Sequence, residues 1–501
     1  MPHIRPVAHG SRLPLYDVAA TRRIETEALA GQPNDALIRQ AGLSVAQLAM
    51  AITPHGPRVW VACGPGNNGA DGLEAARHLQ AWGKQVFVTT LVPGQPDDQA
   101  TGRRLQQAVD AGVTWMPTPP DHVELCIDAI LGLGCQARPL DGRLAAWIDR
   151  IHAQRQSVLS VDLPTGLHPE TGCAAKGSVV ADYTLCLLTL KPGLFTADGR
   201  DLCGRVWLDG LGTQANEIDA TNARLPTAWL TGAPRPGVRL HASHKGSYGD
   251  VGVVGGSRGM TGAALLAASA ALHAGAGRVF VSLLDSQAPS VPFNQPELML
   301  RPIDLLAIEH MAVVCGCGGG AQIADWLPKL LADSRALVLD ADGLNAVATD
   351  PKLGALLRQR SDRSLATVIT PHPLEAARLL GTSTQELQRN RLGAAQELTQ
   401  RFLCTVVLKG SGTVISSPGE VPLINPTGNS RLASAGTGDV LAGMIGAGLA
   451  QGLGTTRAAA DAVFRHGQLA DEWPTRHALT ASRLGSAAQA RPSTPGFSAA
   501  L

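Results

Sequence analysis

The 501-residue chain has few charged and few aromatic side chains. Charged residues make up 17% of it, aromatic residues 4%, and the formal net charge is +1. Nucleic acids and anionic membrane surfaces attract proteins through basic patches, and no such patch stands out, so neither is expected as a partner. The shortage of large side chains, beside 56 glycines, favours closely packed α/β layers joined by Gly-rich turns.

Paired cysteines and long apolar runs are also missing. The nine cysteines are scattered, only Cys315 and Cys317 are close together, and no C-x-x-C pair occurs. This spacing supports neither a structural zinc site nor a disulfide framework. No run is long and apolar enough to span a bilayer, and residues 1–12 lack the apolar region of a signal peptide. We therefore expect a soluble cytoplasmic protein.

The chain is rich in short β-branched runs that alternate with Ala- and Leu-rich helical patterns. The strands expected in the first half are residues 58–63, 85–92, 125–131, 157–164 and 183–190. Those expected in the second half are residues 250–256, 278–284, 311–316, 335–342, 366–371 and 404–410. Near-continuous apolar strands between helices indicate parallel sheets covered on both faces, so the expected fold class is α/β.

A stretch rich in Pro and Gly, residues 226–246, separates the two halves and suggests a domain boundary near residues 218–235. The expected organisation is a first domain over residues 1–220, a second over 221–486 and a mobile tail over 487–501. No repeat links the halves, so we expect two different folds.

The sequence GPGNNG, residues 64–69, follows an apolar strand and precedes a helical pattern that we expect to begin near Asp71. It satisfies G-x-G-x-x-G, and a helix start at this place favours a bound anion. A redox dinucleotide fold also needs an acidic residue on the second strand, about 20 residues on, to bind the ribose. Here that strand ends in TTLVPG, residues 89–94, without Asp or Glu. The loop therefore predicts dinucleotide binding but not a redox enzyme.

Polar residues at the ends of three expected strands suggest a cation site beside this loop. Asn68 lies in the loop, Asp128 lies inside the third apolar strand, and Thr165 follows the fourth. Because the carboxyl ends of parallel strands converge, their oxygen atoms are expected to meet and to suit a hard monovalent or divalent cation. Each residue taken alone is better explained as a helix cap or a turn residue.

Three motifs, GPGNNGADG, DAILGLG and VDLPTGL, resemble the NAD(P)H-hydrate epimerase domain of the bifunctional NAD(P)H-hydrate repair enzymes. This sequence has Ala70 where the family usually has Gly, and Thr165 where it often has Ser. The resemblance implies a Rossmann-like three-layer sandwich, K⁺ bound by Asn68, Asp128 and Thr165, and Asp162 as the acid/base. The residues implied to contact the substrate are Asn67, Asn68, Gly69, Ala70, Asp71, Gly132, Leu133, Gly134, Cys135, Gln136, Ala137, Arg138 and Asp162.

The second half begins with GGSRG, residues 255–259, a literal G-x-S-x-G between a strand and a helix. This is the context of the nucleophile elbow of α/β-hydrolases, with Ser257 as the candidate nucleophile. Asp340 and His372 follow in the matching order, but Asp and His are too common for this order to be strong support. The hydrolase hypothesis also leaves the later motifs unexplained.

The strongest pattern of the second half is AGTGD, residues 435–439, a Gly turn that leads into a helix expected to begin near Asp439. The amides of such a turn bind anions, and Asp439 is placed to deprotonate a hydroxyl. An N-cap Asp after a Gly turn is the simpler alternative. Residues 406–416 predict a strand and a loop, with Lys409 near a phosphate and Thr413 as a hydrogen-bond donor. No Walker A motif occurs.

Seven motifs of the second half resemble the ADP-dependent NAD(P)H-hydrate dehydratase domain of the same enzymes, which has a ribokinase-like fold. They are KGSYG, GMTGAA, CGCGGG, DADGLN, TPHPLE, LKGSGT and AGTGD. Cys317 replaces the Pro that the family usually has. The residues implied to contact the hydrated dinucleotide are Ala263, Gly318, His372 and Asp439. Those implied to hold the adenine nucleotide are Lys409, Gly410, Ser411, Gly412, Thr413 and Gly438.

The resemblance implies a two-site repair enzyme acting on hydrated NADH and NADPH. The first domain is expected to interconvert the R and S hydrates. The second is expected to dehydrate the S hydrate with ADP, giving AMP and phosphate, with Asp439 as the base and Mg²⁺ bridging the phosphates through water held by Glu375. We also expect a homo-oligomer. The alternatives are a ribokinase-like small-molecule kinase fused to a dinucleotide-binding domain, and a non-catalytic dinucleotide sensor.

Overall fold

The structure, a computed structural model, divides into two compact units, Met1–Trp229 and Leu230–Leu501, which are called the first and the second unit below. It describes residues 4–8, 10–91, 99–134, 140, 142–153, 156–213, 225–235, 239–288, 291 and 294–488. The expected boundary between residues 220 and 221 and the expected tail from residue 489 onward lie outside the described residues. Among the helices described, none has both the length and the apolar character needed to cross a membrane.

The first unit is built on a mostly parallel sheet. Its strands are β1 (Arg5–Pro6), β2 (Pro14–Leu15), β3 (Arg58–Cys63), β4 (Gln85–Thr90), β5 (Thr114–Trp115), β6 (Leu125–Ala129), β7 (Ser157–Val161), β8 (Tyr183–Leu187) and β9 (Arg205–Asp209). The sheet order is β1-β9-β8-β7-β6-β3-β4-β5, with parallel pairing from β9 to β5 and an antiparallel β1. β2 pairs with β10 (Ala228–Leu230) in antiparallel fashion.

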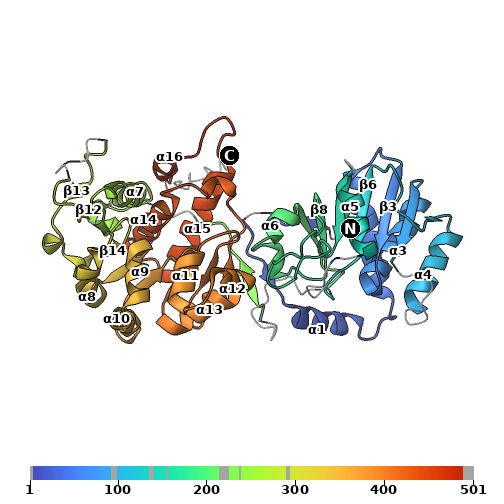
Figure 1. Cartoon of the computed structure of the whole chain (residues 1–501), viewed down its shortest axis with the longest axis horizontal. Helices are drawn as coiled ribbons and strands as arrows, with labels where there is room; N and C mark the ends of the chain where they lie inside the picture. Colours follow the sequence, from blue (N-terminus) through green and yellow to red (C-terminus); the bar gives the residue numbers. More distant parts are fainter. Residues whose placement is uncertain are drawn as a thin grey trace, which may run out of the picture. The chain divides into compact units, whose positions relative to one another are not determined.

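Helices cover both faces of this sheet (Figure 1). They are α1 (Val18–Leu29), α2 (Ala36–Ile52), α3 (Gly66–Ala81), α4 (Gln99–Asp110), α5 (Gly142–Ala153) and α6 (Gly199–Leu202), with the 3₁₀ turn η1 (Pro192–Leu194). Val59 and Val61 of β3 pack with residues of α2 and α3, whereas Trp60 and Ala62 pack with Trp147 of α5. Successive strand residues point to opposite faces, so a wholly apolar strand needs a helix on each side. The expected three-layer α/β sandwich is confirmed.

The second unit has a parallel sheet extended at one side by antiparallel strands. Its strands are β11 (Asp250–Gly255), β12 (Arg278–Leu283), β13 (Met299–Leu300), β14 (Ala312–Cys315), β15 (Ala336–Leu339), β16 (Ala366–Ile369), β17 (Thr405–Leu408), β18 (Val414–Ser416) and β19 (Leu423–Ile424). The order is β13-β12-β11-β14-β15-β16-β17-β18-β19. Pairing is parallel as far as β17 and antiparallel for β18 and β19.

Two groups of helices pack around the strands of the second unit (Figure 1). One group is α7 (Thr261–His273), α14 (Thr437–Ala450), α15 (Thr455–Asp471) and α16 (Ala481–Ser486). The other is α8 (Ile323–Asp333), α9 (Ala341–Thr349), α10 (Pro351–Asp362), α11 (Pro373–Leu380), α12 (Thr384–Arg389) and α13 (Arg391–Phe402). Short 3₁₀ turns complete the unit: η2 (Lys245–Tyr248), η3 (Ile303–Leu305), η4 (Ile308–His310) and η5 (Ser430–Leu432).

Every strand expected from the sequence is present, but several end earlier than predicted. β7 ends at Val161 because Asp162 has φ +66°, and β8 ends at Leu187 because Leu188 has φ +67°. A left-handed residue cannot continue a strand and is uncommon for side chains other than Gly. The chain therefore leaves the sheet sharply at these two residues, which turns the next side chains toward the sheet edge. The strands that were not predicted are short ones, with two to five residues: β1, β2, β5, β9, β10, β13, β18 and β19.

The start of α3 differs from the prediction. We expected this helix near Asp71, and it begins at Gly66, directly after Pro65. Gly66 has φ +79°, a conformation that glycine adopts without steric cost, so the chain turns there into the helix. Asn67, Asn68 and Asp71 consequently lie in the first two turns of α3 rather than in a loop before it.

Candidate active sites

A cavity of about 410 Å³ lies at the carboxyl edge of the first sheet. Its walls come from α1, α2, the start of α3 and the turns that follow β6, β7 and β8. The expected substrate-contacting residues that line it are Asn67, Asn68, Asp71, Gly132, Leu133, Gly134 and Asp162. Four others, Cys135, Gln136, Ala137 and Arg138, lie outside the described residues.

Gly69 and Ala70, by contrast, are buried in α3 and are not among the residues that line the cavity. A Cβ atom on Gly69 would lie 1.8 Å from the carbonyl oxygen of Gly64, and one on Gly64 would lie 1.8 Å from that of Ile130. These glycines let the start of α3 approach the turn after β6. Ala70 is 3% exposed.

The start of α3 offers backbone donors at the cavity. Among the described residues, the N–H groups of Asn67 and Asn68 have no hydrogen-bond acceptor. The first N–H groups of a helix and its dipole together favour an anion. The side-chain amide of Asn67 donates to Glu25 of α1 over 3.2 Å, so this acidic residue, which the sequence had not indicated, also borders the site.

Asp128, on β6, is fully buried and joined to Thr165. Its carboxylate accepts hydrogen bonds from the Thr165 hydroxyl (2.7 Å), the Thr165 N–H (2.9 Å) and the Ser160 hydroxyl (2.9 Å). Burial raises the pKa of Asp128, and these hydrogen bonds oppose the rise. Asn68 lies close by, since its side-chain oxygen would be 3.1 Å from a Cβ on Gly132, and its amide nitrogen is buried without a partner in the described structure.

Asp162 and Lys191 form a buried ion pair at the carboxyl ends of β7 and β8. The Lys191 ammonium donates to the Asp162 carboxylate and to the carbonyl oxygen of Leu187 (3.1 Å). The Leu187 N–H donates to the same carboxylate over 3.3 Å. Asp162 lines the cavity, whereas Lys191 is fully buried and is not among the lining residues. Lys191 was not predicted from the sequence.

Asp71 is a second acidic residue at this cavity. Burial raises its pKa well above the ordinary range, and the nearby charges of Asp162 and Glu25 raise it further, while Arg104 lowers it. Asp71 is thus inclined to hold a proton beside a carboxylate that is paired with an ammonium. Two such environments side by side separate the roles of proton donor and proton acceptor.

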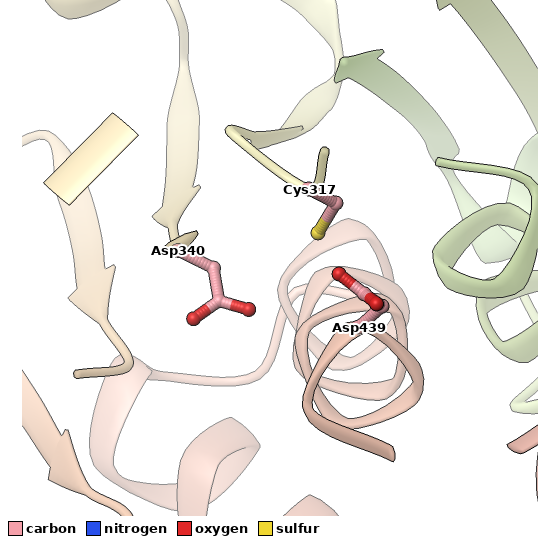
Figure 2. Close-up of side chains that lie close together, drawn as sticks. All are labelled: Cys317, Asp340 and Asp439. Atoms are coloured by element: carbon pink, nitrogen blue, oxygen red, sulfur yellow. The ribbon is translucent and has the colours of Figure 1, made fainter. Parts of the chain in front are cut away.

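The second unit gathers a thiol and two carboxylates at the carboxyl edge of its sheet. Cys317 follows β14, Asp340 follows β15, and Asp439 lies in the first turn of α14. Figure 2 shows the three side chains around one space. The Cys317 sulfur and one carboxylate oxygen from each aspartate lie within 4.8 Å of one another. Burial and the charge of Asp340 raise the pKa of Asp439 to about 6, while a hydrogen bond with Cys317 and the charge of Lys409 lower it.

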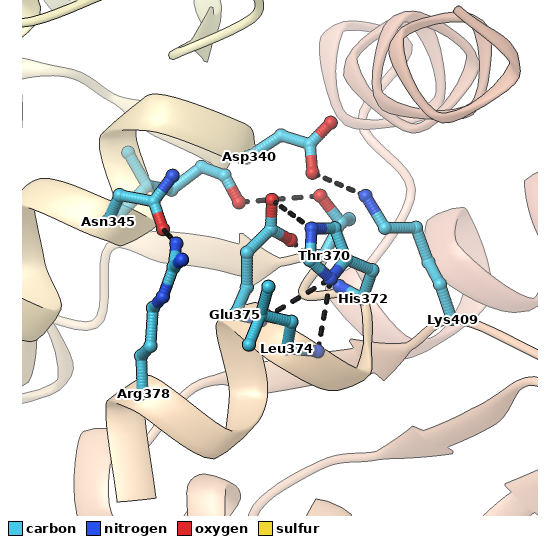
Figure 3. A network of polar contacts seen from close by, with 9 residues as sticks. Asp340, Asn345, Thr370, His372, Leu374, Glu375, Arg378 and Lys409 are labelled. Carbon is cyan, nitrogen blue, oxygen red and sulfur yellow. Dashed lines mark hydrogen bonds and ion pairs between the residues drawn. The ribbon is translucent and has the colours of Figure 1, made fainter. Parts of the chain in front are cut away.

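Lys409 connects these carboxylates to the end of β16. Its ammonium donates to Asp340 over 2.7 Å and lies near Glu375 (Figure 3). Glu375 and His372 form a reciprocal cap on α11. The His372 Nδ1 accepts from the Glu375 N–H (3.3 Å), and the Glu375 carboxylate accepts from the His372 N–H (2.8 Å). The other ring nitrogen of His372 lies 3.1 Å from the Glu375 carboxylate.

The turn before α14 exposes amides beside this charged group. Gly436 has φ +87° and caps the helix, which begins at Thr437, two residues before the predicted start. Among the described residues the N–H groups of Gly438 and Asp439 have no acceptor. A Cβ on Gly438 would lie 3.3 Å from the Lys409 ammonium. Free amides, a lysine and a carboxylate therefore meet at one point, which suits a transferring phosphoryl group and its acceptor.

The remaining predicted residues of this unit lie on neighbouring turns. A Cβ on Gly318 would lie 2.9 Å from the Cβ of Ala263, so the turn after β14 rests on α7. Gly410 and Gly412 have φ +129° and +61°, which bends the chain between β17 and β18. The Thr413 hydroxyl donates to the Gly410 carbonyl over 3.2 Å and braces this turn.

Comparison with known proteins identifies the family. Residues 251–490 match the family model described as NAD(P)H-hydrate dehydratase, and residues 34–193 match that of the YjeF-related protein N-terminus. The bifunctional NAD(P)H-hydrate repair enzyme of Escherichia coli is 34% identical over 457 residues, which cover 87% of this chain and 84% of that protein. This chain belongs to the bifunctional NAD(P)H-hydrate repair enzymes.

Two further matches concern the second unit. The ADP-dependent (S)-NAD(P)H-hydrate dehydratase of Neisseria meningitidis is 42% identical over 240 residues, covering 46% of this chain and 80% of that protein. A crystal structure of the ADP/ATP-dependent NAD(P)H-hydrate dehydratase of Bacillus subtilis, co-crystallised with ATP/Mg²⁺, has a TM-score of 0.42 and 28% identity, covering 51% of this chain and 92% of that one. The two family models and the curated relatives favour the repair enzymes over the kinase alternative.

The hydrolase hypothesis, in turn, is not supported, because the described residues contain no Ser-Asp-His triad at Ser257. The ring of His372 is paired with Glu375, and Asp340 is paired with Lys409. Neither interaction includes Ser257, whose N–H donates to the Gly318 carbonyl over 2.7 Å. G-x-S-x-G is here a tight turn that holds the loop after β14.

Proposed function

We propose that the first unit interconverts the R and S hydrates of NADH and NADPH, and that the second dehydrates the S hydrate at the expense of ADP. Membership of the bifunctional repair enzymes supports the pairing of these activities in one chain. The observation that carries the second activity is Asp439, a carboxylate with a pKa of about 6 beside the free amides that begin α14. Such a group accepts a proton near neutral pH.

In the first unit, Asp162 is proposed to act as the acid/base near the hydrated carbon of the nicotinamide ring. It lines the cavity and forms an ion pair with Lys191. Asp71, which burial inclines to hold a proton, faces the same cavity. The free N–H groups of Asn67 and Asn68 are proposed to bind the anionic part of the dinucleotide.

The residues near Asp128 fit a bound K⁺. Asp128 is a fully buried carboxylate that forms no ion pair with any described residue, and burial raises its pKa. Asn68, with its partnerless buried amide, lies at the neighbouring turn. We propose that Asn68, Asp128 and Thr165 supply oxygen ligands to K⁺, whose charge would favour the ionised carboxylate. Replacing K⁺ by choline is then expected to lower both the melting temperature and the epimerisation rate, with Asp128→Asn removing the response.

In the second unit, Asp439 is proposed to take the proton of the ring hydroxyl while the oxygen attacks the terminal phosphoryl group of ADP. The bond between the two phosphates of ADP breaks and AMP leaves. The free amides of Gly438 and Asp439, with Lys409, stabilise the charge of the transferred group. The ring carbon next to the phosphorylated one then loses a proton, the C–O bond breaks, and the double bond returns as phosphate leaves.

Mg²⁺ is proposed to accompany the phosphates and to neutralise their charge. Glu375 fits a role in holding it through water, because each carboxylate oxygen makes one contact with His372 and keeps a lone pair. Lys409 balances its charge, and hydrogen bonds from His372 outweigh burial, so the pKa of Glu375 is lowered and the group stays ionised.

The proposal is tested with purified full-length chain and separated R and S hydrates. With ADP and Mg²⁺, we expect the absorbance of the reduced nicotinamide to return from both hydrates. Without ADP, we expect each hydrate to be converted into a mixture of the two, with no recovery. Absence of recovery with either ADP or ATP would contradict the dehydratase assignment, and failure to mix the hydrates would contradict the epimerase assignment.

A further inference from the structure

Lys191 is a charged side chain at the first site that is not among the residues lining the cavity. Its ammonium is fully buried, and its carboxylate partner is Asp162. Burying an ammonium is unfavourable unless charge and hydrogen bonds compensate it. Here the compensation comes from Asp162 and from the carbonyl of Leu187. The ammonium thus lies behind the carboxylate, on the side away from the substrate cavity.

The chain contains a second buried lysine that makes a useful contrast. Lys84 donates to three carbonyl oxygens, those of Thr53 (2.8 Å), Pro54 (3.0 Å) and Gly56 (2.7 Å). No carboxylate is within ion-pair distance of it in the described structure. Lys84 therefore cross-links the backbone of the loop between α2 and β3. In this structural role the lysine binds carbonyl groups and no carboxylate. Lys191 instead binds the one carboxylate proposed to carry out the chemistry.

The surroundings of Asp162 explain why it needs a cation. Asp71 of α3 and Glu25 of α1 are acidic neighbours in this charge cluster, and Cys186 of β8 is a buried thiol nearby. Arg104 of α4 acts on Asp71. Without Lys191, the buried Asp162 carboxylate would lose its ion-pair partner, which is unfavourable for a buried charge.

We propose that Lys191 is a positioning residue of the epimerase site, which holds the Asp162 carboxylate in a buried ion pair and directs it into the cavity. The proposal rests on the proposed epimerase function of the first unit. It assigns the lysine no contact with the substrate. Lys191 acts through two restraints on Asp162, its charge and its hydrogen bond, which add to the left-handed backbone of that residue (φ +66°).

The sign of the expected effect follows from the charge. Removing a cation next to a carboxylate favours the protonated form, so a higher pH is needed to ionise Asp162. Epimerisation that uses the ionised carboxylate then loses rate on the acidic side first. Arg keeps the charge but not the compact geometry of the ammonium, so Lys191→Arg separates the two contributions.

The experiment measures R-to-S interconversion against pH, above the uncatalysed rate, in full-length wild type, Lys191→Met, Lys191→Arg and Lys84→Met. Circular dichroism and thermal unfolding of each sample report the amount of folded protein, because dehydration in the second unit would not detect unfolding of the first. We expect Lys191→Met to slow epimerisation at least about tenfold near neutral pH and to move its acidic limb upward by about one pH unit or more. Lys191→Arg should keep the position of the limb at a reduced rate, and Lys84→Met should keep the wild-type profile.

Two results would overturn the proposal. One is a Lys191→Met profile that is lowered at all pH values in proportion to lost folded protein, as for a purely structural residue. The other is additivity of Lys191→Met and Asp162→Asn in thermal unfolding, because a buried pair should make the double variant more stable than the sum of the single losses. Failure of the wild type to epimerise at all would instead contradict the proposed function itself.

Discussion

The two sites of the chain contain the same kinds of chemical group in different arrangements. Each lies at the carboxyl edge of a parallel sheet, beside free amides at a helix start, and each contains a lysine and more than one aspartate. In the first unit the lysine, Lys191, contacts the proposed acid/base Asp162 directly. In the second unit Lys409 contacts Asp340, and the proposed base Asp439 has no ion-pair partner among the described residues.

The two sites also differ in which carboxylate has a raised pKa. Asp439 is partly buried and lies next to the charge of Asp340, so its pKa rises to about 6. It can therefore accept a proton from a hydroxyl and release it again near neutral pH. In the first unit the raised pKa belongs to Asp71, the neighbour of the ion-paired Asp162. The position of one ammonium thus distinguishes a single base from a site with separate donor and acceptor.

The largest effect is expected when the proposed base of the second unit, Asp439, is removed. Asp439→Asn keeps the size of the side chain but cannot accept the hydroxyl proton, so dehydration of the S hydrate should fall by about 10²- to 10⁴-fold. Epimerisation should stay at the wild-type rate because it belongs to the other unit. Both are measured on one preparation, by recovery of reduced-nicotinamide absorbance and by separation of the R and S hydrates. Loss of both activities in a folded variant would show that the units are not independent.

The reciprocal change is Asp162→Asn. We expect epimerisation to fall by about 10²-fold or more, with dehydration of pure S hydrate unchanged. With a mixture of hydrates and ADP, the variant should consume the S form and leave the R form, which chiral separation detects. Continued consumption of the R hydrate at the wild-type rate would mean that another group, with Asp71 as the first candidate, carries the chemistry.

The sequence could predict the strands and the aspartates of both sites for a physical reason. Apolar strands of a parallel sheet are near-continuous runs that are easy to recognise, and polar residues at their carboxyl ends converge on one edge of the sheet. Lys191 carried no such signal, because it follows a strand within TLKPGL, and a lysine is usually solvent-exposed. Its partner became evident only when the left-handed residues Asp162 and Leu188 directed both side chains to the same point.

Glu25 and the start of α3 escaped prediction for another reason. Glu25 lies on α1, about 40 residues from the loop that it contacts, and only tertiary packing brings them together. The start of α3 depended on the conformation of Gly66, which the pattern G-x-G-x-x-G does not specify. Ala70 was expected in the substrate cradle on the resemblance alone, and the helix that begins at Gly66 instead buries its methyl group.

The pH dependence of the dehydration rate tests the raised pKa of Asp439. Asp439 must be ionised to accept a proton, and its pKa is about 6, so the rate should be at its plateau well above this pH and fall below it. One pH unit below the pKa, the rate should be lower by about tenfold. The limb is measured with saturating S hydrate and ADP between mildly acidic and mildly alkaline buffers. A flat profile across this range would exclude Asp439 as the titrating base.

Cys317 has a smaller effect on the pH at which the dehydration rate begins to fall. Its buried thiol is hydrogen-bonded with Asp439, and this contact lowers the pKa of the carboxylate. Cys317→Ala should therefore move the acidic limb upward by less than about one pH unit, with the plateau rate within a few-fold of wild type. Cys315→Ala, at another buried cysteine two residues away on β14, is the matched control and should leave the limb in place. Equal shifts in both variants would indicate a general packing effect instead.

The smallest effect is expected at Ala70, where the backbone of the first site, rather than its charges, is altered. Ala70→Gly removes a methyl group that is 3% exposed and is not among the cavity-lining groups, so the KM for the hydrates should stay within twofold or so of wild type. Gly in a helix interior costs about 1 kcal/mol relative to Ala, which should lower the melting temperature of this unit by about 2–4 °C. Calorimetry and steady-state kinetics check the two parts. A large fall in KM would place the methyl group against the substrate and require a different arrangement of the start of α3.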